Sequence, residues 1–269
     1  MFYFWLSMTM EHVSVWSAWK GKAVVVSGGT RGIGRVIAER FLRAGAAVLV
    51  CARKPPEREI AIDGRVAHFV AADIREPAEI ERVVGEAKAK MGRLDVLVNN
   101  AGGSPPADAA TASPRFSAAI INLNLTAPLT FAQRANAIMQ TQAEGGVIVN
   151  VASVSGLRPS PGTAAYGAAK AGLISLTRSL AMEWAPKVRV VAVAPGPIRT
   201  ELAEMHYGDA AAQARVAATV PLGRLGEPSD VAEACFMLAS PACAWISGSC
   251  LVLDGGGERP AFLGAAKVD

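Results

Sequence analysis

Tyr166 and Lys170 stand four positions apart in the segment Tyr-Gly-Ala-Ala-Lys, a spacing that places both side chains on one face of a helix. A phenol with the ordinary pKa of ~10 exchanges protons poorly at neutral pH. A neighbouring ammonium stabilises the phenolate and lowers that pKa, so we expect the pair to donate or accept a proton. Ser153 precedes Tyr166 by thirteen positions, and its hydroxyl can hydrogen-bond an oxygen on which charge develops. These residue types indicate proton transfer to or from a carbonyl or alcohol oxygen.

A glycine-rich turn near the beginning of the chain indicates a binding site for a phosphorylated cofactor. The turn consists of Ser27, Gly28, Gly29, Thr30, Arg31, Gly32, Ile33 and Gly34. Its glycines permit a tight bend and let backbone N–H groups approach a pyrophosphate at the beginning of a helix. We therefore expect a dinucleotide here, the alternative being a turn that is only flexible.

The residues that follow the second apolar run distinguish between two dinucleotides. An acidic residue there would bind the ribose 2′-hydroxyl of NAD(H), but the sequence has Arg53 and Lys54. Arg53 can bind a 2′-phosphate through charge-assisted hydrogen bonds, with Arg31 as a second cation, so NADP(H) is favoured over NAD(H). The alternative is that both are solvated loop charges. Asp73, followed by Ile74, could accept a hydrogen bond from adenine or could simply begin a turn.

Short apolar runs alternate with longer helical stretches along the chain, as in proteins with parallel sheets. The predicted strands cover 23–27, 47–51, 66–70, 94–99, 146–152, 188–194 and 250–254. The predicted helices cover 32–44, 77–92, 113–139, 163–185 and 228–239. Because the strands are apolar on both faces, we expect an α/β fold, a doubly wound (Rossmann) seven-stranded parallel sheet with helices on both faces, in a single domain.

Ligands of such a sheet bind beyond the carboxyl ends of its strands. Ser153 follows the fifth predicted strand and the glycine-rich turn follows the first, so both belong to this edge. Taken singly, the Tyr166/Lys170 pair could be helix surface and Ser153 a helix cap. Their common position at one edge favours a proton-transfer site.

Together these segments resemble the short-chain dehydrogenase/reductase family, in its subgroup with the YxxxK motif, from Lys20 to Gly256. The matching motifs, in the order and spacing of the family, are Gly28-x3-Gly32-Ile33-Gly34, Asn99-Asn100-Ala101-Gly102, Ser153, Tyr166-x3-Lys170 and Pro195-Gly196. The resemblance implies an NAD(P)(H)-dependent oxidoreductase that transfers a hydride between a nicotinamide and a ketone or secondary alcohol.

The resemblance also implies roles for individual residues. The catalytic set is Asn124, Ser153, Tyr166 and Lys170. Asn124 is selected over Asn122 by the family's asparagine-leucine-threonine-glycine pattern and would hold a water in the proton relay, while Lys170 would also contact the nicotinamide ribose. The residues expected to bind the cofactor are Ser27, Gly28, Thr30, Arg31, Gly32, Ile33, Gly34, Arg53, Asp73, Ile74, Asn100, Ala101, Gly102, Tyr166, Lys170, Pro195, Gly196, Ile198 and Thr200. The last four of these would lie at the nicotinamide end.

The substrate is not named by the sequence. We expect its site to be built from residues 201–221, which resemble the family's mobile lid, and from loops 155–162 and 103–109. Met205, His206 and Tyr207 are candidate pocket residues. A 3-oxoacyl thioester, a steroid-like ketone and a simple keto-alcohol all stay open, with the first two slightly favoured by their frequency in the family. An alternative of a different class is a non-catalytic NADP(H)-binding or sensing protein, against which the intact catalytic set argues.

Composition bounds the partners. The 27 basic and 23 acidic side chains are interspersed and give a formal net charge of +4, so no nucleic acid or membrane partner is expected. The four cysteines and three histidines are scattered, which predicts no metal site, no disulfide and a cytoplasmic location. Residues 1–18 are expected to form an N-terminal extension, neither a secretory signal nor a membrane span, before a catalytic domain over 19–269. A homo-oligomer, tetramer or dimer, is implied by the resemblance alone.

Overall fold

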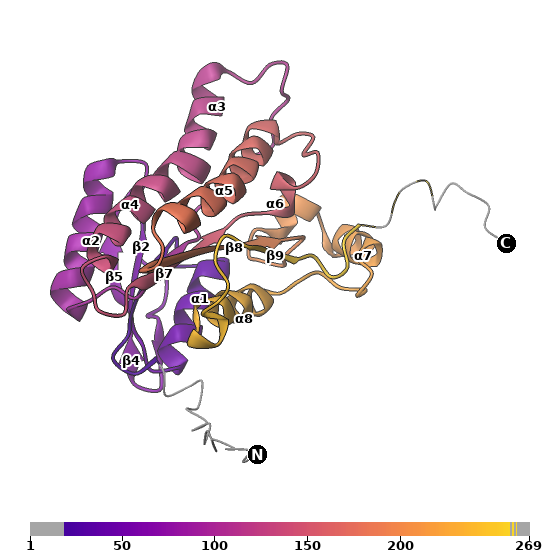
Figure 1. Ribbon diagram of the computed structural model, residues 1–269. Coiled ribbons are helices and arrows are strands. Elements are labelled where there is room, and N and C mark those ends of the chain that lie inside the picture. The colour runs from indigo at the N-terminus through magenta and orange to yellow at the C-terminus, as the bar shows by residue number, and fades with distance from the viewer. Residues whose placement is uncertain (1–18, 259, 261, 263–269) are drawn as a thin grey trace, which may run out of the picture.

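The computed structural model describes residues 19–258, 260 and 262, and the predicted extension over 1–18 lies outside the described residues. A seven-stranded sheet forms the centre of the molecule, in the order β5-β2-β1-β6-β7-β8-β9, and every neighbouring pair in it is parallel (Figure 1). Its strands are β1 (Ala23–Ser27), β2 (Ala47–Ala52), β5 (His68–Ala71), β6 (Val96–Asn99), β7 (Gly146–Val151), β8 (Val188–Pro195) and β9 (Cys250–Leu253). This confirms the predicted doubly wound sheet.

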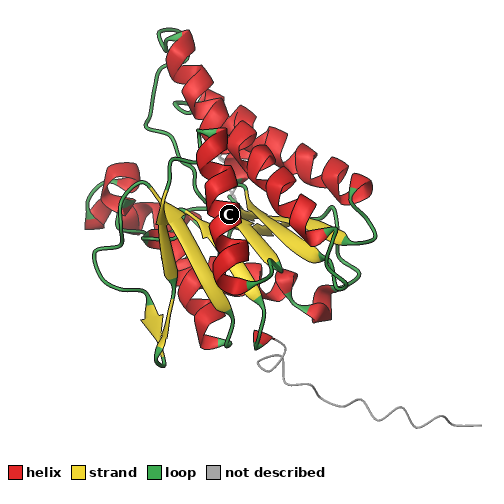
Figure 2. Ribbon diagram, turned by 90° about the vertical axis from the view of Figure 1, so that its left-hand side faces the viewer, coloured by secondary structure: helices red, strands yellow, loops and turns green. Residues whose placement is uncertain are grey.

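Helices cover both faces of the sheet (Figure 2). They are α1 (Gly32–Arg43), α2 (Pro77–Met91), α3 (Pro114–Ile121), α4 (Ala127–Met139), α5 (Ala164–Glu183), α6 (Ala203–Tyr207), α7 (Ala210–Thr219) and α8 (Pro228–Ala239). Successive side chains of a strand point to opposite faces, so the side chains of β1 pack into two separate hydrophobic cores, one on each face of the sheet. Val24 and Val26 pack with α1 and α8, whereas Val25 packs with α2 and α4. All five residues of β1 are buried, which explains its continuous apolar sequence.

The order of strands in the sheet changes direction next to β1. The chain places β2 and β5 on one side of β1 and β6 to β9 on the other. A crevice forms where the order of strands reverses, beyond the carboxyl ends of β1 and β6. The glycine-rich turn after β1 and the Asn-Asn-Ala-Gly segment after β6 therefore lie side by side at this edge.

Three segments differ from the prediction. The predicted strand 66–70 is two elements, because β3 (Ala61–Ile62) and β4 (Arg65–Val66) form a separate antiparallel hairpin before β5. Asp63 and Gly64 both have positive φ in its turn, and an Asp-Gly pair is a common hairpin signal. The predicted helix 113–139 is interrupted by a π-helical turn over Asn122–Thr126, and the predicted lid contains α6 and α7.

Within the described residues, no helix is both long and apolar enough to cross a membrane, and no three His, Cys, Asp or Glu side chains are grouped as a metal would require. All four cysteines are free thiols.

Candidate active site

The backbone of the glycine-rich turn packs so tightly against its neighbours that side chains would not fit at two of its glycines. Gly28 has a φ of +64°, and a Cβ added there would lie 3.0 Å from the Cα of Ala101. A Cβ on Gly34 would overlap the carbonyl oxygen of Gly28. The turn leads into α1, whose N-cap residue Arg31 makes no side-chain capping hydrogen bond and whose first turn has no acidic residue. The N–H groups that begin α1 thus suit an external anion, and this cradle fits a dinucleotide pyrophosphate.

Ser27 and Asn100 tie the turn to the segment after β6. The Ser27 hydroxyl accepts hydrogen bonds from the backbone N–H groups of Asn100 and Ala101, at 3.0 and 3.1 Å. The Asn100 amide nitrogen donates to the carbonyl oxygens of Ser27 and Gly28, at 2.9 and 3.3 Å. Ser27 is buried, so its hydroxyl shapes the site through these backbone contacts.

The expected adenosine end carries three cations and one carboxylate. Arg53 follows β2 directly and is exposed, as is Lys54. Arg75 donates to both Asp73 oxygens through its Nε, at 2.9 and 3.1 Å, a contact that the sequence analysis missed. Hydrogen bonding from Arg75 and the more distant charge of Arg53 hold the pKa of Asp73 below its ordinary value. Asp73 also begins a turn, since its carbonyl oxygen accepts from the Glu76 N–H at 3.0 Å. Ile74 is buried beside it.

Ser153, Tyr166 and Lys170 come together at the carboxyl edge of the sheet. Ser153 lies just beyond β7, where its hydroxyl accepts from the Ser155 N–H at 3.1 Å and is close enough to the Tyr166 phenol to lower its pKa. Lys170 lies one turn along α5, with its Nζ 5.6 Å from the centre of the Tyr166 ring. The same ammonium donates to the Val151 carbonyl oxygen at 2.7 Å, which fixes its position beneath the ring.

Asn124 lies within the π-helical turn and is fully buried. Its amide nitrogen donates to the carbonyl oxygens of Ile120 and Gly103, at 2.9 and 3.0 Å, and its Oδ1 accepts from the Gly103 N–H at 2.9 Å. A Cβ added to Gly102 would lie 2.6 Å from Asn124 Oδ1 and 3.2 Å from Lys170 Nζ. The Asn124 and Lys170 head groups therefore lie on either side of Gly102. π-Helical turns are frequent at functional sites, and this one carries Asn124.

Burial dominates the ionisation of the pair. It raises the pKa of Tyr166 above its ordinary value, an effect opposed by the neighbouring Ser153 hydroxyl and reinforced by nearby Tyr207. It lowers the pKa of Lys170 from 10.5 to about 8. The expected lowering of the Tyr166 pKa is therefore not met in the chain by itself, because loss of solvation by burial is the largest effect on the phenol.

The expected nicotinamide end is formed by the end of β8 and the loop after it. Pro195 ends β8, and the Gly196 N–H donates to the Leu253 carbonyl oxygen at 2.8 Å. Ile198 is buried and forms an isolated parallel bridge with Gly226. The Thr200 hydroxyl accepts from the Leu202 N–H at 3.3 Å. These residues share the carboxyl edge with Ser153 and the glycine-rich turn.

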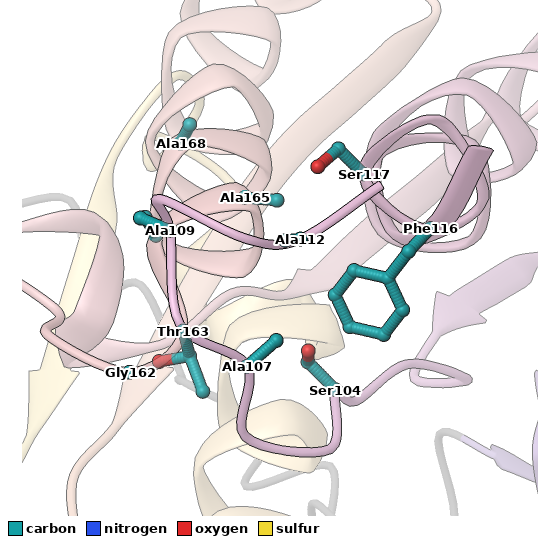
Figure 3. Close-up of a pocket in the computed structure, with 11 residues that line it drawn as sticks. Ser104, Ala107, Ala109, Ala112, Phe116, Ser117, Gly162, Thr163, Ala165 and Ala168 are labelled. Atoms are coloured by element: carbon teal, nitrogen blue, oxygen red, sulfur yellow. The ribbon is translucent and has the colours of Figure 1, made fainter. Parts of the chain in front are cut away.

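A pocket of about 330 Å³ lies beside the predicted substrate loops (Figure 3). It is lined by loop residues 104, 107, 109, 112, 162 and 163, by Phe116 and Ser117 of α3, and by Ala164, Ala165 and Ala168 of α5. Ala164 and Ala168 each stand two positions from Tyr166, so they lie on the opposite side of α5. These two alanines thus line the pocket from the side of α5 that faces away from Tyr166, while Ala165, the residue before Tyr166, also lines it.

Comparison with known proteins places this geometry among oxidoreductases. Residues 28–258 match a family model described as enoyl-(acyl carrier protein) reductase. A Bacillus subtilis protein named as a probable 2,4-dienoyl-CoA reductase is 37% identical over 87% of this chain and 96% of its own. A 3alpha-hydroxysteroid dehydrogenase from Mediterraneibacter gnavus is 35% identical over 88% and 96%.

A solved structure gives the same result for the fold. The aldohexose dehydrogenase of Thermoplasma acidophilum, in ligand-free form, superposes with a TM-score of 0.83 at 30% sequence identity. The match covers 94% of this chain and 98% of the dehydrogenase. The similarity thus extends over nearly the whole length of both chains.

Proposed function

The chain belongs to the short-chain dehydrogenase/reductase family, and from this premise we propose that it uses NADP(H) to interconvert a ketone and a secondary alcohol, with Tyr166 as the proton-transferring residue. As a member of the family it is an NAD(P)-dependent oxidoreductase. The assignment of individual residues is supported above all by one observation: Ser153, Tyr166, Lys170 and Asn124 gather beside a cradle shaped for a pyrophosphate.

The side chains divide the work of reduction as follows. A bound reduced nicotinamide would supply the hydride. The Ser153 hydroxyl hydrogen-bonds the substrate oxygen and stabilises the charge that develops on it. Tyr166 protonates that oxygen, and the Lys170 ammonium stabilises the phenolate left behind. Asn124 fixes the backbone at Gly103 next to the lysine and would hold the relay water.

The central test is Tyr166→Phe, which removes the phenolic proton and keeps the ring. We expect NADPH affinity to stay within a few fold while turnover falls by at least ~10²-fold, the usual scale for loss of a general acid. Turnover is followed by absorbance of the reduced nicotinamide, and NADPH binding by its fluorescence. Undiminished turnover in the variant would refute the role of Tyr166, and nucleotide binding without turnover of any carbonyl compound would favour a sensing protein.

Preference for NADP(H) is supported by Arg53, an exposed cation directly after β2 where no carboxylate stands. We expect Arg53→Ala to weaken NADPH binding far more than NADH binding. Lys54→Ala is the matched control, because it removes an equally exposed cation from the next position. Equal losses for both nucleotides in Arg53→Ala would show that Arg53 does not contact the 2′-phosphate.

For the substrate we propose an apolar carbonyl compound, of the 3-oxoacyl thioester or steroid-like class. Two relatives are named for a dienoyl-CoA and a hydroxysteroid substrate, and the lid of this chain is rich in alanine, with Met205 exposed. A panel of acyl thioesters, steroid ketones and sugars, each tested with NADPH and NADH, separates these classes. A strong preference for sugars would contradict the proposal.

The assembly and location are proposals of a similar kind. A homo-oligomer is supported by the small exposed residues Ala164, Ala168 and Ala171 on α5, which permit close helix packing. A cytoplasmic location is supported by the four free thiols. The extension over 1–18 and the lid over 201–221 are proposed as parts accessory to the catalytic domain.

A further inference from the structure

Glu201 makes a contact that none of the roles above explains. It follows Thr200 at the nicotinamide end, yet its Oε1 accepts a hydrogen bond from the Gly32 N–H at 3.1 Å, across 169 positions of the chain. A Cβ added to Gly32 would lie 3.3 Å from the other carboxylate oxygen. The Glu201 carboxylate therefore lies directly over the beginning of α1.

This position is the one that the pyrophosphate of a dinucleotide would take. The free N–H groups and the dipole at the beginning of a helix favour an anion there. The sequence around α1 provides none, because its N-cap is Arg31 and its first turn has no acidic residue. Glu201 supplies the missing negative charge from the lid. A carboxylate oxygen and a phosphate oxygen accept from an N–H group in the same way, so they compete for Gly32.

The other end of the same lid segment lies against the nicotinamide end. Tyr207, the last residue of α6, is half-buried and close enough to Tyr166 to influence its ionisation. The backbone of Ile198 is close enough to the Tyr207 phenol to lower its pKa, against the larger, raising effect of burial. Ile198 is among the residues expected to contact the nicotinamide. Residues 201–207 thus lie beside the expected cofactor site at two places, the pyrophosphate turn through Glu201 and the nicotinamide end through Tyr207.

We propose that Glu201 is an intramolecular substitute for the cofactor pyrophosphate, so that the dinucleotide enters by displacing Glu201 and, with it, the first turn of the lid. This inference rests on the proposed function, since it presupposes a dinucleotide at the glycine-rich turn. The lid is then coupled to cofactor binding through one carboxylate, and the affinity for the cofactor is lowered by the free energy of the Glu201–Gly32 contact.

The test is E201Q in the full-length chain, which removes the charge and keeps the shape. E204Q is the matched control, since Glu204 is an exposed carboxylate of the same lid and its loss changes the net charge equally. From the strength of charge interactions at helix termini, we expect E201Q to lower the Kd of NADPH roughly 3- to 10-fold and E204Q to leave it within about 2-fold. The gain should appear as a higher association rate, because the contact is made by the free protein.

Adenosine 2′-phosphate serves as a second probe because it lacks the pyrophosphate. Its Kd should be the same for wild type and E201Q. Equal tightening of NADPH and adenosine 2′-phosphate, a matching effect of E204Q, or a change confined to the dissociation rate would each overturn the inference. So would unchanged or weakened NADPH binding by E201Q.

The proposed function fails by a different result. If neither wild type nor E201Q binds NADPH or NADH, the dinucleotide site itself is wrong, and the inference is overturned with it. If wild type binds NADPH and reduces a carbonyl compound but E201Q behaves as wild type, only the displacement of Glu201 is refuted.

Discussion

Replacing Lys170 with methionine tests how strongly the site penalises a buried charge. The side chain is buried in α5, and burial lowers the pKa of its amine from 10.5 to about 8. At ~1.4 kcal/mol per pKa unit, this difference corresponds to about 3 kcal/mol of destabilisation when the group is fully protonated. Methionine fills a similar volume without the charge.

The unfolding free energy depends on pH through the Lys170 proton, which the folded and unfolded chains bind with different pKa values. Below pH 8 both the folded and the unfolded chain carry the Lys170 proton, so the whole penalty is present. Between pH 8 and 10.5 the unfolded chain still binds this proton and the folded chain does not, so stability rises with pH. From pH 7 to 9.5 wild type should gain about 2 kcal/mol relative to Lys170→Met.

The difference in unfolding free energy between wild type and Lys170→Met at pH 7 alone is less informative than its change with pH. Lys170 donates to the Val151 carbonyl oxygen at 2.7 Å, and hydrogen bonds of charged groups contribute about 1.5–3 kcal/mol. Loss of this bond in the variant offsets most of the relief from burial, so the two proteins should unfold at similar urea concentrations at pH 7.

The assay is urea unfolding followed by circular dichroism, for both proteins, without nucleotide, at pH 7, 8.5 and 9.5. Subtracting the variant from wild type cancels the titration of every other group that the substitution leaves alone. A difference in unfolding free energy that is constant across this range would refute the reasoning, because it would mean that Lys170 keeps its proton as readily in the folded chain as in the unfolded one.

Two glycine substitutions test the geometry of the site. Gly34→Ala should weaken NADPH binding at least ~10-fold, because its Cβ would overlap the Gly28 carbonyl oxygen. Gly85→Ala is the control, since a Cβ added there, in the middle of α2, would meet no neighbouring atom within 4 Å. It should stabilise the fold by about 0.5–1 kcal/mol. Binding titrations and thermal melts would show this, and unaltered NADPH affinity in Gly34→Ala would contradict the cradle. Gly102→Ala places a Cβ 2.6 Å from Asn124 Oδ1, so turnover should fall ~10²-fold by misplacement of the relay. Unchanged steady-state turnover would show that Asn124 need not hold this position.

The strands were predictable because each is buried on both faces and so has a continuous apolar sequence. The hairpin before β5 was missed since His68 to Ala71 and Val66 read as one run, although Asp63-Gly64 marked a turn. Alpha-helix α7 also had a local signal, in Asp209, whose carboxylate caps the Ala212 N–H at 2.8 Å before an alanine-rich stretch. The π-helical turn had none, because a π-turn and an α-turn differ in hydrogen bonding more than in residue preference.

The site was predictable where it depends on motifs and topology, and not where it depends on the lid. Ser153 and Tyr166 meet because both follow β7 at the carboxyl edge of the sheet, Ser153 directly after the strand and Tyr166 in the first turn of α5. The Glu201–Gly32 contact joins the sixth strand's loop to the first strand's turn, and nothing in either segment names the other. Its existence depends on how the lid lies across the crevice.

The sequence predicted that Lys170 lowers the pKa of Tyr166, and this expectation was not met. The physical reason bears on how the proposed site works. Burial favours the neutral form of both Tyr166 and Lys170, so the chain by itself does not provide an acidic phenol. In the proposed reduction, however, Tyr166 gives its proton to a substrate oxygen, so the phenolate is formed beside the ammonium and replaces a lone buried cation with an ion pair. The same poor solvation that opposes each charge alone strengthens their attraction. Reduction should therefore depend on Lys170 being protonated, and should weaken as the pH rises through its pKa of about 8.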